Sequence, residues 1–358
     1  MRRDRLTFAM MVGVPIIQLA LFGFAINTDP KHLPLAINSA DHSQFTRSIE
    51  AALVNSGYFK IITVTDSEAD VESLLERGEV QFVLEIPADF STRLLRGERP
   101  SLLIAADATD PAATSNALAV LQNLLNQPLL HDLLGSLASL QATAAPYDII
   151  VHRRYNPEGV TQYNIVPGLM GVILTMTMIM MTALAVTREQ ERGTMENLLS
   201  MPAQPLEVMI GKIVPYIFVG YVQVTVIMIA ARWVFGVPML GSLLLLFFCV
   251  LVFILANLTV GITFSSIASN QTQAMQMSFF FFLPSILLSG FMFPFRGMPV
   301  WAQVIGEVLP LTHFLRLVRG ILLKGNDAIQ SWQHIWPLTI FMLVVMGVGL
   351  LRYRRTLD

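Results

Sequence analysis

Residues 188–202 read REQERGTMENLLSMP, a charged and helix-favouring stretch that separates two of the longest apolar runs in the chain. The run before it is IVPGLMGVILTMTMIMMTALAVT, at residues 165–187, and the run after it is IVPYIFVGYVQVTVIMIAARWVF, at residues 213–235. A bilayer core about 30 Å thick is crossed by roughly 20 apolar residues in a helix. Each flanking run is long enough, so the stretch is predicted to connect two membrane-spanning helices.

The composition of the whole chain agrees with a membrane protein. Of its 358 residues 54% are hydrophobic and 13% are charged, whereas soluble domains carry about 25% charged residues. The charge is unevenly distributed, because residues 28–160 hold 9 Lys and Arg against 17 Asp and Glu, and the remainder holds 14 against 8. An acidic part joined to a basic, apolar part indicates one protein in two environments.

Six segments are long and apolar enough to cross a bilayer as helices. They lie at residues 6–26, 164–186, 213–235, 243–267, 275–293 and 335–351. Arginines flank both ends of the chain, at Arg2, Arg3 and Arg5 and again at Arg352, Arg354 and Arg355. Lys and Arg are enriched in cytoplasmic loops, so both termini and the loop at 187–212 are predicted to be cytoplasmic.

Residues 28–160 form a loop far too long to be a simple connection. The strand-like pieces are LPLAIN, YFKIITV, VQFVLEI and SLLIAAD, and the helix-like pieces are HSQFTRSIEAALVNSG, SEADVESLLERG and ADFSTRLLRG. These alternating patterns predict an α/β extracytoplasmic domain inserted between helices 1 and 2. A long helix is expected to follow, with a leucine stripe that packs on the sheet or on a second copy of the chain. Its stripe consists of Leu118, Leu121, Leu125, Leu129, Leu133 and Leu137.

The connecting stretch is predicted to contain a helix of its own. Thr187 and Gln190 have the spacing of a capping box that would restart a helix at the membrane exit, and Pro202 and Pro205 would end it. The apolar face consists of Met195, Leu198 and Leu199, and the polar side of Glu189, Arg192 and Glu196. Either this is a solvated interfacial helix, or it is a lever that docks a cytoplasmic partner. The apolar face favours the lever, because a solvated turn gains nothing from it.

The sequence contains no recognisable nucleotide-binding, hydrolase or metal-binding motif. There is no GxxxxGK[ST] loop, no G-x-S-x-G or HExxH motif, and no His, Cys or acidic cluster at metal-ligand spacing. Cys249 is the single cysteine and lies in an apolar run. We therefore expect no catalytic residue, no metal, no cofactor and no nucleic-acid partner in this chain. ATP, if used, would be bound with magnesium by another subunit.

Three stretches in this order resemble ABC transporter permeases of the ABC-2 type. They are RRYNPEGVTQYNIVPGLMGVIL at residues 153–174, TREQERGTMENLLSMPAQPLEVMIGK at 187–212, and LSGFMFPFRGMPVWAQVIGEVLPLTHFLRLVRGILLKG at 288–325. The resemblance implies a six-transmembrane-helix ABC-2 exporter permease, with residues 1–27 as a cytoplasmic turn and first helix, 28–160 as a periplasmic domain and 161–358 as the transmembrane domain. Within the last part, residues 294–330 would form an outer helical hairpin. Relatives usually begin with an amphipathic interfacial helix, whereas this sequence starts at the RRDR turn that follows it.

The resemblance also implies partners. A separate ABC ATPase would drive the permease, two permeases would dimerise in the bacterial inner membrane, and a periplasmic adaptor with an outer-membrane channel could complete a drug or xenobiotic exporter. The loop between the second and third spans contacts the ATPase in this family. The implied coupling residues are Arg188, Glu189, Glu191, Arg192, Gly193, Thr194, Glu196, Leu198 and Leu199.

The same resemblance places an export path along the second and fifth spans. Its candidate residues are Met178, Phe282, Ser285 and Ser289. Methionine and phenylalanine make adaptable apolar surfaces, although packing in the bundle core or against lipid is the alternative for each. The helix at 310–324 carries His313, Arg316 and Arg319 among apolar residues. They either reach to the headgroups or build an outer gate.

Other functions are considered beside the export of an amphipathic compound. An ABC-2 exporter of a lipid or glycan would share the same motifs. A membrane-anchored periplasmic sensor would need a cytoplasmic output domain, and the cytoplasmic pieces are all short. An ion-driven transporter usually needs charged residues near the middle of the membrane, and the predicted spans have almost none there. The sequence therefore favours an exporter permease that works by alternating access.

Overall fold

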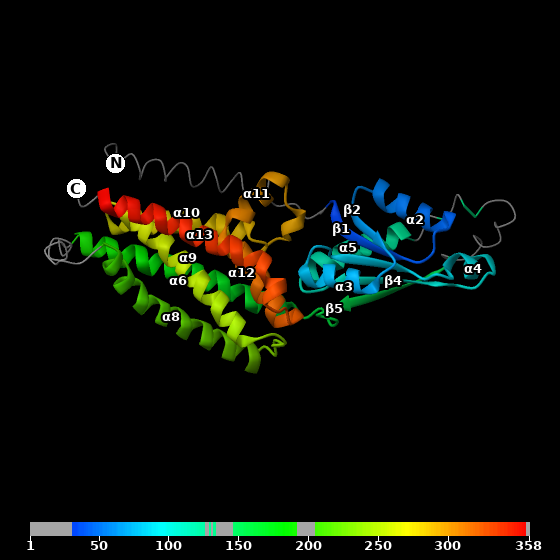
Figure 1. Ribbon diagram of the computed structural model, residues 1–358, viewed down its shortest axis with the longest axis horizontal. Coiled ribbons are helices and arrows are strands. Elements are labelled where there is room, and N and C mark those ends of the chain that lie inside the picture. The colour runs from blue at the N-terminus through cyan, green and yellow to red at the C-terminus, as the bar shows by residue number, and fades with distance from the viewer. Residues whose placement is uncertain (1–30, 126–128, 130–131, 134–145, 192–204, 356–358) are drawn as a thin grey trace. The chain divides into compact units, whose positions relative to one another are not determined.

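The computed structural model describes residues 31–125, 129, 132–133, 146–191 and 205–355 (Figure 1). The described residues divide into two compact units, one within Thr28–Asn164 and one within Ile165–Asp358. The first predicted span, at residues 6–26, lies outside the described residues.

The first unit is built on a five-stranded sheet with strand order β2-β1-β3-β4-β5. Strand β1 pairs in parallel with β2 and β3, β3 pairs antiparallel with β4, and β4 pairs in parallel with β5. The strands are β1 (Leu33–Ser39), β2 (Phe59–Thr65), β3 (Phe82–Ile86), β4 (Ser101–Asp107) and β5 (Asp148–Arg154). Strands β1, β3 and β4 are buried on both faces, as expected for the middle of a sheet covered by helices.

Four helices accompany the sheet. They are α2 (Gln44–Asn55), α3 (Glu68–Arg77), α4 (Phe90–Leu95) and α5 (Pro111–Leu125). Ser43 and Ser67 cap α2 and α3, each accepting a backbone hydrogen bond with its side chain. Gly78 ends α3 at a positive φ of 72°, a conformation that costs glycine little. The predicted helix-like segments therefore form helices, and the four predicted strand-like segments form β1 to β4.

The leucine stripe and the last strand depart from the sequence analysis. Helix α5 ends at Leu125, and Leu129 and Leu133 follow it in a turn and a bend, so the predicted single helix is wrong. Both still enter the core with Leu118, Leu121 and Leu125, because the stripe packs on the sheet. Leu137 lies outside the described residues. Strand β5 was not predicted, because its sequence DIIVHRR alternates weakly and ends in three polar residues.

The second unit is a bundle of long helices. Its long members, which run side by side in Figure 1, are α6 (Thr161–Glu191), α8 (Pro205–Trp233), α9 (Leu243–Ile267), α10 (Gln271–Leu288) and α13 (Ala328–Arg355). Between α10 and α13 lie a 3-10 turn at Phe295–Gly297, α11 (Val300–Val308), α12 (Pro310–Arg319) and a π-helical turn at Gly320–Lys324.

Helix α9 forms the centre of the bundle and has the largest share of buried residues among the long helices. The ring of Phe253 in α9 stacks on Phe314 of α12, with centroids 4.0 Å apart and planes at 6°. Gly220 of α8 faces Ile254 of α9, and Gly261 of α9 faces the backbone of α6 at Ile179. Small residues therefore allow two neighbouring helices to approach α9 closely.

Helix boundaries differ from the predicted spans where local patterns are weak. Helix α9 has the predicted bounds, whereas α6 extends five residues beyond residue 186 and α13 starts seven residues before residue 335. The predicted fifth span at 275–293 is wrong at both ends, because α10 runs from Gln271 to Leu288. Gly290 has a φ of 83°, which turns the chain out of the helix.

Candidate functional site

The end of α6 carries the first residues of the predicted coupling segment. The helix passes through Thr187 without a break, and the Thr187 hydroxyl donates to the carbonyl of Ala183 at 2.8 Å. The predicted capping box at Thr187 and Gln190 is therefore wrong, because a threonine inside a helix can bond to the carbonyl four residues earlier. Arg188, Glu189 and Glu191 consequently extend the same helix that crosses the apolar core.

Glu191 joins the end of α6 to the beginning of α10. Its Oε1 accepts the backbone N–H of Gln271 at 2.8 Å, and its Oε2 accepts the Gln271 side-chain amide at 2.5 Å. Asn270 caps α10 by accepting the backbone N–H of Gln273. The hydrogen bonds from Gln271 hold the pKa of Glu191 below its ordinary value. A carboxylate at a helix N-terminus is also favoured by the helix dipole, so this contact ties two long helices together.

Only part of the predicted coupling set can be placed. Arg188 is exposed and Glu189 is half-buried at the end of α6. The remaining members, Arg192, Gly193, Thr194, Glu196, Leu198 and Leu199, and the predicted apolar face with Met195 lie outside the described residues. Gln271, the partner of Glu191, was not predicted, because it is 80 residues away along the chain.

The candidate path residues fall into two groups. Phe282 of α10 lines a narrow crevice against α6, together with Met176, Met180 and Ser278, and the crevice is too narrow to hold a water molecule. Met178 is fully buried on another side of α6, and its sulfur lies near Gly220 of α8. The structure therefore brings Phe282 to the α6–α10 contact and places Met178 in the core.

The two serines of the candidate path are buried and bonded within their own chain segment. Ser285 donates to the carbonyl of Phe281 at 2.7 Å, and Ser289 donates to the carbonyl of Ile286 at 3.2 Å. In this conformation both hydroxyls therefore donate to backbone carbonyls of the preceding turn and not across the bundle.

Two of the candidate gate residues, His313 and Arg316, belong to a polar cluster around Glu307 of α11. Arg316 of α12 donates to both carboxylate oxygens of Glu307, at 3.0 and 2.7 Å, and its guanidinium lies 4.6 Å from the centre of the Phe295 ring. The paired geometry uses the planar fork of arginine. Glu307 was not predicted, because it precedes Arg316 by nine residues on a separate helix.

His313 extends this cluster towards α13. Its Nε2 lies 2.8 Å from the carbonyl oxygen of Glu307, and its Nδ1 lies 3.4 Å from Nδ1 of His334. Burial lowers the pKa of His313, and the nearby Arg316 lowers it further, while the Glu307 carbonyl opposes this effect. Arg319 lies apart from Glu307 and donates to the carbonyl of Gly290 at 3.4 Å, so it contacts the turn that follows α10.

Four of the described helices are long and apolar enough to cross a membrane. They contain the segments Thr161–Glu189, Ile213–Trp233, Leu243–Ile267 and Ala328–Gly349. Helix α10 is not among them. With exposed apolar residues along α8 and α13, these helices define a multi-pass membrane protein.

Residues 5–351 match the family described as ABC-2 family transporter protein. The chain belongs to this family and is a membrane permease of the ABC-2 type. It is 28% identical to the probable multidrug ABC transporter permease YbhR of Escherichia coli strain K12 over 353 residues, which cover 99% of this chain and 95% of the relative. It is also 28% identical to the probable multidrug ABC transporter permease YbhS, over 99% of this chain and 94% of the relative. The inner membrane transport permease YhhJ of the same organism is 29% identical, over 90% of this chain and 86% of the relative.

Proposed function

We propose that the chain is the permease subunit of an ATP-driven exporter that moves a hydrophobic or amphipathic, drug-like compound outward across the bacterial inner membrane. ATP with magnesium is bound by a partner ABC ATPase, and two permeases form the transport unit. The names of the relatives YbhR and YbhS support the drug-like substrate class. The mechanism is alternating access, in which closure of the ATPase dimer tilts α6 and opens a path between the two permeases.

The contact between Glu191 and Gln271 carries this proposal. The coupling segment begins on the last turn of α6, and Glu191 there accepts two hydrogen bonds from the first residue of α10. A force on residues 188–200 would therefore move both helices that flank the crevice at Phe282. The crevice is closed here, and separation of α6 from α10 would open it along with Met176 and Met180.

The apolar length of α6 supports opposite compartments for its two ends. Residues 161–189 are long enough to cross a bilayer, so the α/β unit before them and the coupling segment after them face different sides. All four tryptophans of the chain lie at the end of the bundle where α8 ends and α13 begins. They are Trp233, Trp301, Trp332 and Trp336, and all are exposed. Tryptophan is enriched at both membrane–water interfaces, so this end of the bundle lies at one of them. We assign it to the outer one because the coupling segment follows the opposite end of α6.

This orientation makes residues 28–160 periplasmic and both termini cytoplasmic. It requires six spans, which are the four long apolar helices, α10 and residues 6–26. The acidic α/β unit is then the part that meets a periplasmic adaptor and, through it, an outer-membrane channel.

Charge reversal at the coupling segment tests the proposal. In a reconstituted complex of this permease with its ATPase, Glu191→Lys combined with Glu196→Lys should abolish substrate-stimulated ATP hydrolysis, because a cation at residue 191 cannot accept the hydrogen bonds from Gln271. Glu68→Lys, an exposed reversal on α3, is the matched control and should leave hydrolysis unchanged. If the double variant keeps both ATPase association and substrate stimulation, the coupling assignment fails.

The cluster around Glu307 is proposed as the outer gate. Arg316→Ala removes the paired hydrogen bonds to Glu307 and the contact with Phe295, so export should be lost while the complex still assembles. Transport into inverted vesicles measures the first effect, and size-exclusion chromatography with the ATPase measures the second. Unchanged transport by the assembled variant would rule out a gate at Arg316.

A further inference from the structure

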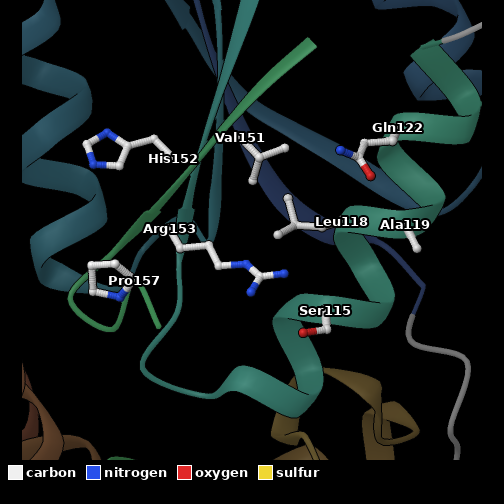
Figure 2. A pocket seen from close by; sticks show the side chains of 8 residues that line it. All are labelled: Ser115, Leu118, Ala119, Gln122, Val151, His152, Arg153 and Pro157. Carbon is white, nitrogen blue, oxygen red and sulfur yellow. The ribbon is translucent and has the colours of Figure 1, made fainter. Parts of the chain in front are cut away.

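A groove in the α/β unit lies between α5 and the edge strand β5 (Figure 2). Its volume is about 580 Å³, which is within the range of roughly 300–1,000 Å³ typical of small-molecule sites. In Figure 2, Val151 and Arg153 point from β5 towards Leu118 on α5, while His152 points to the other side of the strand. The alternation of side chains along a strand explains this arrangement.

The groove has an apolar wall. Leu118 is buried at the edge of the sheet core, and Val151 packs against the same core while remaining partly accessible. Pro157 closes one end of the groove. A ligand in the groove could therefore bury an apolar body against Leu118 and Val151 without disturbing the core.

The polar groups of the groove point to an anion. Arg153 is half-buried, and within the described part of the chain its guanidinium forms no ion pair or hydrogen bond, in contrast to Arg154, which pairs with Glu72 at 3.0 Å. Ser115 offers a hydroxyl at the same end of the groove, and Gln122 offers an amide further along α5, across from Val151. None of the lining residues is acidic, although Asp and Glu outnumber Lys and Arg in residues 28–160 by 17 to 9. The lining of the groove is thus basic, through Arg153, although the domain as a whole is acidic.

We propose that this groove binds an amphipathic organic anion. Its carboxylate, sulfonate or phosphate group would pair with the planar fork of Arg153, which suits two-oxygen acceptors, and its apolar body would lie on Leu118 and Val151. Ser115 would donate to a remaining oxygen. The groove lies within one compact unit, so the proposal does not depend on the transport mechanism.

Cysteine protection in the full chain tests the proposal. The native Cys249 is buried, so it should react little with a water-soluble maleimide. Ser115→Cys then introduces an accessible thiol whose reaction can be followed. In lipid nanodiscs, naphthalene-2-sulfonate should slow the reaction of this thiol with a water-soluble maleimide in a saturable manner. The cation 1-naphthylmethylammonium and inorganic phosphate should give at least tenfold weaker protection, because the first has the wrong charge and the second lacks an apolar body. Val54→Cys, exposed on α2, should not be protected by any of them.

A second set of variants assigns the effect to Arg153. In the Ser115→Cys background, Arg153→Gln should raise the half-protecting concentration of naphthalene-2-sulfonate at least tenfold, and Arg153→Lys should restore part of the protection. Arg47→Gln, which removes an exposed arginine of α2, should leave it unchanged. Failure of the sulfonate to protect, equal protection by the cation, or unchanged protection after Arg153→Gln would each overturn the proposal.

Discussion

Gly261 shows how one residue can decide the spacing of two helices. A Cβ at this position of α9 would lie 2.8 Å from the carbonyl oxygen of Ile179 and 3.3 Å from the backbone nitrogen of Ala183, both on α6. Backbone atoms cannot move aside as a flexible side chain does, so any substitution must push α6 away. The position of α6 also sets the position of Glu191 at its end, which accepts hydrogen bonds from Gln271 of α10.

Gly261→Ala is therefore expected to destabilise the bundle by about 1–3 kcal/mol, the usual cost of overpacking. The control is Gly347→Ala on α13, where an added Cβ meets no atom within 4 Å and alanine is the better helix former. Thermal unfolding of the detergent-solubilised chain, followed by fluorescence-detected size exclusion, measures both. Equal melting temperatures for the two variants would mean that the close approach to α6 is not energetically important.

In the hairpin of α11 and α12, charged side chains lie among buried apolar ones. Helix α12 is almost entirely buried, yet it holds His313 and Arg316 among apolar neighbours. These two side chains have partners on α11 and α13: Glu307 accepts from Arg316, and His334 lies beside His313. These contacts join three helices, so the protonation of His313 affects the packing of all of them.

The stability of this hairpin should depend on pH. Burial lowers the pKa of His313 in the folded protein, while an unfolded histidine titrates near 6.5. The unfolded state then binds the proton more readily, so the free energy of unfolding is fully retained above about pH 6.5 and falls as the pH drops below this value.

His313→Gln should weaken this dependence, because glutamine does not titrate. The melting temperature of the wild type should drop between pH 7.5 and 5.5 by more than that of the variant. His42→Gln, at an exposed position of the α/β unit, is the control and should behave like the wild type. An identical pH profile for His313→Gln and wild type would contradict the expected role of burial.

At the scale of the whole molecule, the two units differ in the environment that their surfaces fit. The bundle exposes apolar side chains along α8 and α13, such as Phe218, Ile229 and Val344, as expected for helices that face lipid. The α/β unit instead buries an apolar core around Leu35, Ile49 and Leu84. One chain therefore has a membrane-facing unit and a water-facing unit.

The proposed orientation predicts which positions are accessible from outside the cell. Val54→Cys on α2 should react with a membrane-impermeant maleimide in intact spheroplasts, because residues 28–160 are proposed to be periplasmic. Gly211→Cys, an exposed position near the start of α8, should react only after lysis. The buried Cys249 keeps the background low in both cases. Labelling of Gly211→Cys in intact spheroplasts would reverse the proposed orientation.

Sequence patterns were reliable where one local signal dominates. The apolar run at Leu243–Ile267 predicted α9 to the residue, and the strand-like pieces LPLAIN and SLLIAAD became β1 and β4. They failed where local signals compete, as at Thr187, which bonds back into α6 instead of starting a new helix. The weakly alternating strand β5 was missed for a related reason, since its pairing with β4 and its packing on the core are tertiary contacts.

By itself, the sequence determined the membrane class, the family and the α/β character of residues 28–160, because apolar length, periodicity and family motifs are local properties of the chain. Only the tertiary structure decided that Glu191 binds Gln271, that Glu307 pairs with Arg316 and that Arg153 lies in a groove with Leu118. These relations join residues on different elements, up to 80 positions apart. They exist only after packing has brought those elements together, so no local pattern could encode them.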